Sequence, residues 1–204
     1  METALTALNY DISWLELIGT LTGLVSVWLA VRNNLLTWPV GIVNVICFAL
    51  LFYQFRLYSD ALLQVYFLGM SLYGWYHWRS DGVGERPVNL LPTPARLRWL
   101  FVIGAGTLVL GTLMGKADQL APKLFPEPAA FPYPDAFTTT TSIVATYLLA
   151  RRTLESWFLW VAVDLVAIVL YFSKGIVLIG LEYIVFLGLA SLGGWRWYYT
   201  LRNA

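Results

Sequence analysis

The residues best suited to bind a charged ligand lie within one apolar stretch of the sequence. Asp164 follows Trp157 by seven positions and Trp160 by four. At about 100° per residue, these three side chains share one face of a helix. Two indole rings attract an aromatic cation through their faces, and a carboxylate neutralises its charge. The alternative is that both rings anchor the helix at an interface and that Asp164 is protonated or paired with another polar group.

Further polar side chains lie inside apolar stretches and could contact the same ligand. Asn44 could bond the ligand or form a hydrogen bond between helices. Gln64 and Ser71 lie seven positions apart, on one helix face, and could bond hydroxyl or amide groups. Glu182 is either a second anionic contact or a partner for a nearby cation such as Lys174.

Other kinds of chemistry find little support in the sequence. One histidine (His77), one cysteine (Cys47) and no cluster of carboxylates predict no metal site and no cofactor. No phosphate-binding loop and no nucleophile elbow occur, so the sequence predicts neither an ATPase nor an enzyme with a nucleophilic triad. His77 is expected to be an interfacial residue and Cys47 a small core residue.

The composition identifies the surroundings of these residues. Of the 204 residues, 59% are hydrophobic and 12% are charged, about half the roughly 25% charged residues of an average soluble domain. A net charge of +1 provides no basic excess for binding nucleic acid. High hydrophobicity excludes a disordered chain, and a single cysteine excludes an intrachain disulfide framework. The remaining class is an all-α polytopic membrane protein.

Seven stretches are apolar enough to cross a bilayer, which needs about 20 such residues per helix. They are residues 13–31, 36–55, 58–78, 97–114, 136–150, 154–172 and 176–198. The predicted domains are an external segment (1–12), a first three-helix bundle (13–78), a cytoplasmic loop (79–96), a linker helix (97–114), a stiff proline-rich external loop (115–135), a second three-helix bundle (136–198) and a cytoplasmic tail (199–204). Tryptophans near the helix ends, among them Trp38, Trp78 and Trp197, suggest an aromatic belt.

The two predicted bundles resemble each other in sequence. With an offset of 120 residues, Ser71-Leu72-Tyr73-Gly74-Trp75 aligns with Ser191-Leu192-Gly193-Gly194-Trp195, and Asn44 aligns with Asp164. A parallel repeat of three helices, joined by one linker helix, is an architecture of transporters that bind substrate near the midplane between the halves. The alternative is an old duplication kept for packing alone.

The basic residues predict how the chain is oriented. With seven spans, one side carries Arg56, Lys116, Lys123 and Lys174. The other side carries Arg32, Arg79, Arg86, Arg96, Arg98, Arg151, Arg152, Arg196 and Arg202. The positive-inside rule therefore places the N-terminus outside and the C-terminus inside. Residues 1–11 contain no Lys or Arg, so no signal peptide is expected.

Three stretches resemble the PnuC family of bacterial vitamin transporters. They are Gly41-Ile42-Val43-Asn44 with the following Tyr53-Gln54-Phe55-Arg56-Leu57-Tyr58, then Leu63-Gln64-Val65-Tyr66 with Tyr73-Gly74-Trp75-Tyr76, and Glu155-Ser156-Trp157-Phe158-Leu159-Trp160 with Asp164 and Leu181-Glu182-Tyr183-Ile184. The resemblance implies a three-plus-one-plus-three fold similar to a SWEET transporter, a homotrimer and a location in the bacterial inner membrane.

The resemblance also implies a function and its site. The expected activity is facilitated diffusion of nicotinamide riboside, which a cytoplasmic kinase then traps by phosphorylation. The motif positions imply that Trp157, Trp160 and Asp164 bind the substrate, with Gln64, Asn44 and Glu182. Family members for the riboside often have Asn where this chain has Asp164, a departure that favours thiamine as the second substrate, ahead of riboflavin. Two further hypotheses are a non-transporting membrane subunit and an intramembrane enzyme with Asp164 and Glu182 as acid and base.

Overall fold

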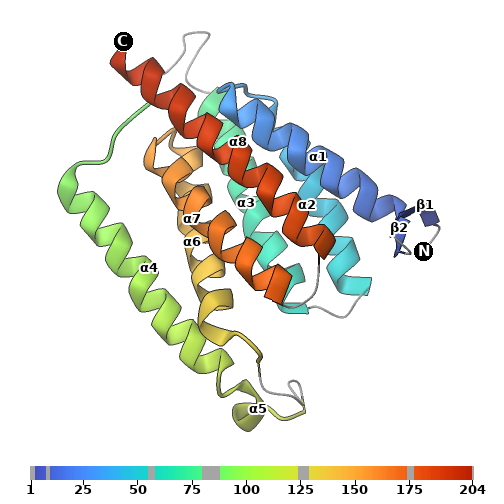
Figure 1. The fold of residues 1–204 in the computed structure, drawn as a ribbon. Helices are drawn as coiled ribbons and strands as arrows, with labels where there is room; N and C mark the ends of the chain where they lie inside the picture. Colours follow the sequence, from blue (N-terminus) through green and yellow to red (C-terminus); the bar gives the residue numbers. More distant parts are fainter. Residues whose placement is uncertain are drawn as a thin grey trace. The chain divides into compact units, whose positions relative to one another are not determined.

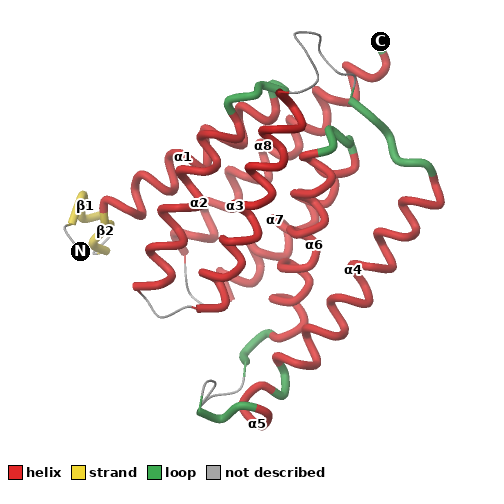
Figure 2. The backbone as a smooth tube through the Cα atoms, turned by 180° about the vertical axis from the view of Figure 1, so that it is seen from behind, coloured by secondary structure: helices red, strands yellow, loops and turns green. Residues whose placement is uncertain are grey.

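The computed structural model describes residues 3–7, 10–54, 58–79, 88–123, 129–173 and 177–203 and is mostly helical (Figures 1 and 2). Its elements are β1 (Thr3–Ala7), β2 (Tyr10–Ser13), α1 (Trp14–Val31), α2 (Thr37–Gln54), α3 (Tyr58–Arg79), α4 (Thr93–Met114), α5 (Ala117–Leu120), α6 (Pro132–Ala150), α7 (Glu155–Ser173) and α8 (Val177–Arg202). The chain divides into two compact units, Met1–Pro87 with Arg202–Ala204, and Val88–Leu201.

The first unit begins with a short antiparallel sheet, in the segment that the sequence left without a predicted element. β1 pairs with β2 in a register that joins Thr3 to Ser13 and Ala7 to Tyr10. Two β-branched threonines in β1 favour a strand over a helix. The sheet ends at α1, where the Ser13 hydroxyl accepts a hydrogen bond of 3.2 Å from the Glu16 N–H. This contact caps the helix.

The helices of the first unit pack in chain order, α1 on α2 and α2 on α3. Paired polar contacts fix the α1–α2 hairpin near its turn. The Ser26 hydroxyl donates to the Thr37 carbonyl at 2.8 Å, and the Thr37 hydroxyl donates to the Ser26 carbonyl at 2.8 Å. Each hydroxyl therefore has a backbone carbonyl of the other helix as its acceptor, without water, as a membrane interior requires.

In the second unit, α6 packs against both α4 and α7. Ile103 of α4 forms a buried apolar cluster with Val144 and Leu148 of α6. α6 begins at Pro132 rather than at the predicted residue 136, and α5 forms one turn inside the predicted extended loop. Proline is well suited to the first turn of a helix, where its missing N–H has no partner to lose.

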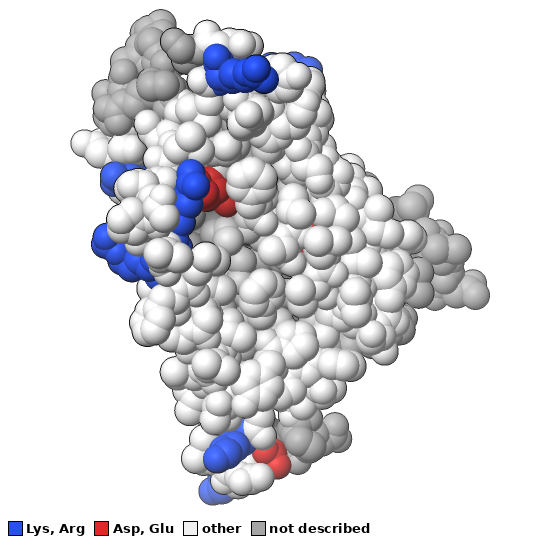
Figure 3. All heavy atoms as spheres, turned by 60° about the vertical axis from the view of Figure 1, so that its left-hand side comes forward, with Lys and Arg blue, Asp and Glu red and all other residues white. Residues whose placement is uncertain are grey.

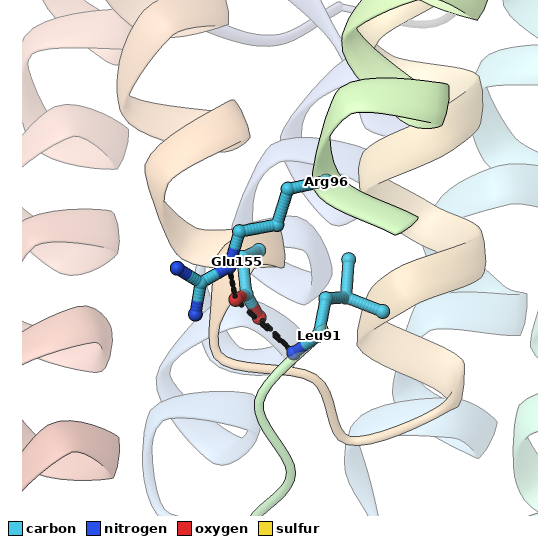
Figure 4. A network of polar contacts seen from close by, with 3 residues as sticks. All are labelled: Leu91, Arg96 and Glu155. Atoms are coloured by element: carbon cyan, nitrogen blue, oxygen red, sulfur yellow. Dashed lines mark hydrogen bonds and ion pairs between the residues drawn. The ribbon is translucent and has the colours of Figure 1, made fainter. Parts of the chain in front are cut away.

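A short segment before α4 forms backbone hydrogen bonds with the turn between α6 and α7. The Asn89 N–H donates to the Arg152 carbonyl at 2.9 Å, and the Leu154 N–H donates to the Asn89 carbonyl at 2.9 Å. Figure 4 shows the next contacts, in which both carboxylate oxygens of Glu155 accept from the Leu91 N–H, at 3.1 and 3.2 Å. The Arg96 guanidinium donates to the same carboxylate at 2.8 Å.

The turns of the two units have the same geometry. Asn33, after α1, has φ 53°, and Arg152, after α6, has φ 52°. The Asn33 N–H donates to the Ala30 carbonyl, and the Arg152 N–H donates to the Leu149 carbonyl, each at 2.9 Å. The sequence alignment of the two bundles uses an offset of 120 positions. Asn33 and Arg152 instead lie 119 positions apart, as do Ala30 and Leu149.

The helix packing follows the same offset. The Trp38 and Trp78 rings meet edge to face at 5.2 Å and 90°, and Trp157 and Trp197 do so at 5.4 Å and 85°. All four residues of these two pairs are at most 4% exposed, so none of them belongs to an exposed belt. With this offset Asp164 corresponds to Val45, and the sequence alignment of Asn44 with Asp164 is off by one residue.

Three of the helices, α1, α4 and α7, combine the length and the mean hydropathy of a membrane span, judged over the described residues. The prediction of seven spans stays a prediction. Large apolar side chains are exposed along α4, for example Leu100, Phe101 and Leu108 at 60–75%. Figure 3 shows a broad surface without charged side chains, as contact with lipid requires.

Candidate functional site

α7 carries a buried carboxylate. Asp164 is 2% exposed, and its Oδ2 atom has no hydrogen-bond partner among the described residues. An unpartnered carboxylate oxygen in an apolar interior carries a large desolvation penalty. Such an atom is suited to receive a cation or a hydrogen-bond donor from a ligand, because either would offset this penalty.

The two predicted tryptophans lie on the same helix, with different degrees of burial. Trp157 is 1% exposed, and a Cβ atom on Gly193 of α8 would lie 2.6 Å from its ring. The close approach of α8 to this ring is therefore possible only because residue 193 is glycine. Trp160 is half-buried, one turn before Asp164. Of the two rings, Trp160 is the more accessible to a ligand.

The remaining predicted site residues are divided between the units. Asn44, Gln64 and Ser71 belong to the first unit, whereas Glu182 lies on α8 of the second. Gln64 and Glu182 are half-buried, and Ser71 is buried. The structure thus brings Trp157, Trp160 and Asp164 together on one helix.

Asn44 makes a contact between helices. Its Nδ2 atom donates to the Gly19 carbonyl of α1 at 2.8 Å. This is the structural role that the sequence left open for this residue.

Sequence reasoning missed two features of the second unit. Thr141 of α6 is 0% exposed, and its hydroxyl has no hydrogen-bond partner among the described residues. The run Thr138-Thr139-Thr140-Thr141-Ser142 suggested only hydroxyls that bond back to the helix. The contact between Arg96 and Glu155 was also missed, because these two residues lie 59 positions apart and no local pattern pairs them.

The described residues contain no group of three or more His, Cys, Asp or Glu side chains that could hold a metal ion. The chemistry available at α7 is therefore that of a carboxylate, indole rings and nearby hydroxyls. Such groups bind and orient a ligand.

Comparison with known proteins agrees with this arrangement. The model of the nicotinamide mononucleotide transporter family matches residues 13–199. The nicotinamide riboside transporter PnuC of Escherichia coli (strain K12) is 33% identical, over 96% of this chain and 89% of that relative. The riboflavin/roseoflavin transporter RibM of Streptomyces davaonensis is 30% identical, over 98% of this chain and 92% of the relative.

A solved structure has the same fold. The crystal structure of the vitamin B3 transporter PnuC superposes with a TM-score of 0.71 at 24% identity, over 94% of this chain and 83% of that one. The resemblance seen in the sequence is confirmed, and the relatives are transporters rather than enzymes. Together with the apolar helices, they identify a multi-pass protein of the inner membrane. This chain belongs to the nicotinamide mononucleotide transporter family.

Proposed function

We propose that this protein imports nicotinamide riboside across the inner membrane by facilitated diffusion. The observation that carries the proposal is the buried carboxylate of Asp164, whose Oδ2 atom has no partner among the described residues. Nicotinamide riboside has a cationic pyridinium ring, and a carboxylate at this depth would neutralise that charge. The 33% identical relative is named as a transporter of the same compound.

The proposed site has a division of roles. Trp160, which is half-buried, stacks on the pyridinium ring, while Trp157 forms the wall behind it. Asp164 supplies the counter-charge. Glu182 of α8, in the same unit, is a second anionic contact.

The proposed substrate is the free riboside rather than its phosphate. Neither α6 nor α7 contains a Lys or an Arg residue that could bind a phosphate. A phosphate would also be repelled by the Asp164 carboxylate. Phosphorylation by a cytoplasmic kinase would then prevent the product from leaving, which makes net import one-way.

The proposal includes an assembly and an orientation. The transporter is a homotrimer with its N-terminus outside and its C-terminus inside. The excess of arginine on the side of the C-terminus supports this orientation.

The test is a binding titration of the purified protein, followed by uptake into liposomes. We expect nicotinamide riboside to bind, and the Asp164→Ala variant to lose at least about tenfold in affinity, which corresponds to about 1.4 kcal/mol. Asp118→Ala on α5 is the control for loss of an aspartate elsewhere. Unchanged affinity in a folded Asp164→Ala variant would exclude the proposed role of this carboxylate.

Riboflavin is the second candidate, because a relative at 30% identity is named as a riboflavin transporter. Its isoalloxazine ring is neutral, so riboflavin binding should be insensitive to Asp164→Asn. Thiamine, which is cationic, should respond as nicotinamide riboside does. Running the three compounds and nicotinamide mononucleotide in one titration separates these substrates.

A further inference from the structure

Thr141 differs from three other threonines of its helix. Thr138, Thr140 and Thr146 each donate to a carbonyl three or four residues earlier in α6. Thr141 makes no such bond and is 0% exposed. A buried hydroxyl that could bond back to its helix and does not is left with an unsatisfied donor and acceptor. This arrangement is expected where a ligand supplies the partner.

Thr141 and Asp164 lie at the same depth on two packed helices. Thr141 is nine residues before Ala150, the last residue of α6, and Asp164 is nine residues after Glu155, the first residue of α7. At about 1.5 Å per residue, both positions lie about 14 Å from the turn that joins these helices. α6 and α7 pack against each other within one unit. Two buried polar side chains with unpartnered atoms therefore occur at one level of this helix pair.

The two groups have complementary hydrogen-bonding capacities. An ionised carboxylate only accepts, whereas a threonine hydroxyl can donate. A primary carboxamide needs both, because its NH₂ group donates and its carbonyl oxygen accepts. We propose that Thr141 and Asp164 together recognise the carboxamide of the substrate, with the Thr141 hydroxyl donating to the carbonyl and Asp164 accepting from the NH₂ group. This assignment rests on the proposed function, since it presupposes a nicotinamide-like ligand.

The assignment makes Thr141 a specificity-determining residue. A carboxylate in place of the carboxamide, as in nicotinic acid riboside, would bring a second negative charge to Asp164 and be rejected. A pyridinium riboside without any substituent would keep its positive ring but would offer nothing to the Thr141 hydroxyl. The two compounds thus distinguish recognition of charge from recognition of the amide.

The experiment measures dissociation constants by isothermal titration calorimetry with the purified full-length protein. The variants are Thr141→Val, which keeps the shape and removes the hydroxyl, and Thr141→Ser, which keeps the hydroxyl. Thr146→Val is the matched control, because that hydroxyl is also buried in α6 but already bonds to the Ser142 carbonyl at 2.7 Å. The ligands are nicotinamide riboside and unsubstituted pyridinium riboside.

We expect Thr141→Val to bind nicotinamide riboside about tenfold more weakly, while Thr141→Ser and Thr146→Val stay within about threefold of the original protein. Binding of pyridinium riboside should be the same in all four proteins. Equal weakening for both ligands would overturn the assignment, because it would mean that Thr141 acts through packing. Unchanged binding of nicotinamide riboside by Thr141→Val would overturn it as well. Failure of the original protein to bind nicotinamide riboside would instead refute the proposed function and, with it, this assignment.

Discussion

Substitution by alanine is expected to have opposite effects on stability at two glycines of α8. A Cβ atom on Gly193 would lie 2.6 Å from three atoms of the Trp157 ring, which also meets the Trp197 ring edge to face. The Trp157 ring is 1% exposed, so Gly193→Ala is expected to destabilise the protein by about 1–3 kcal/mol through overpacking. At about 2–4 °C per kcal/mol for a chain of this size, thermal unfolding in detergent should show a loss of several degrees.

Gly188 provides the matched control on the same helix, because its added Cβ would meet no atom within 4 Å beyond its chain neighbours and the adjacent backbone of α8. Gly188→Ala should leave the unfolding temperature unchanged or raise it slightly, since alanine favours a helix over glycine. In the first unit, Gly74→Ala and Gly69→Ala should repeat the contrast. The Gly74 Cβ would lie 2.5 Å from the Trp38 ring, whereas the Gly69 Cβ would meet nothing within 4 Å. Equal unfolding temperatures for Gly193→Ala and Gly188→Ala would contradict this packing.

Part of the candidate site was predictable from the residue types in the sequence. Asp164 and its two tryptophans were identified because a carboxylate in an apolar stretch is rare and because helical spacing is regular. The burial of Trp157 was not predictable, because it depends on Gly193, which lies 36 residues later. Thr141 was missed for a related reason. Whether a threonine bonds back to its helix depends on a side-chain rotamer that the sequence does not encode locally.

At the scale of elements, Glu155 connects the start of α7 to the segment before α4. Glu155→Ala would remove the acceptor of the half-buried Leu91 N–H as well as the partner of Arg96. We expect a loss of about 1–3 kcal/mol in the free energy of unfolding, because an amide would lose its partner. Chemical unfolding followed by circular dichroism measures this loss.

Arg96→Ala tests the ion pair separately from the backbone contact. The Arg96 side chain is 45% exposed, so solvent screens its interaction with Glu155. Its removal is expected to lower the free energy of unfolding by less than about 1 kcal/mol. An effect of Arg96→Ala as large as that of Glu155→Ala would show that the ion pair, rather than the Leu91 contact, stabilises this junction.

The ends of the elements were less predictable than the elements themselves. Hydropathy located the long helices, but α4 begins at Thr93 and α6 at Pro132, each four residues before the predicted start. Both first turns contain proline, which suits this position although it is not apolar enough to extend a hydropathy segment. The sheet of β1 and β2 was missed because a five-residue strand leaves a weak signal.

At the scale of the whole molecule, the proposed orientation can be measured by cysteine labelling. The single cysteine, Cys47, is buried. In a Cys47→Ala background, Gln119→Cys on α5 and Asn203→Cys after α8 would each add one exposed thiol. We expect a membrane-impermeant maleimide to label Gln119→Cys in intact spheroplasts and Asn203→Cys only after permeabilisation. The reverse pattern would contradict the proposed orientation.

The sequence alignment of the two predicted bundles uses an offset of 120 residues, whereas their turns and tryptophan pairs correspond at 119. The aligned block placed Gly74 opposite Gly194, whereas Gly193 is the glycine that meets the Trp157 ring. Two adjacent glycines allow either alignment, and only packing distinguishes them. The turns at Asn33 and Arg152 then fix the offset independently, since both residues have the same left-handed conformation.

The two tryptophan pairs have a consequence for spectroscopy. Indole rings 5.2 and 5.4 Å apart, at 90° and 85°, are close enough for their electronic transitions to couple. Each pair is therefore expected to contribute a signal to the near-ultraviolet circular dichroism spectrum that vanishes when its two helices separate. Replacing Trp38 by phenylalanine would leave the signal of the second unit, and replacing Trp197 would leave that of the first. The protein thus contains one intrinsic optical reporter in each half, with which the opening of either bundle can be followed without an added label.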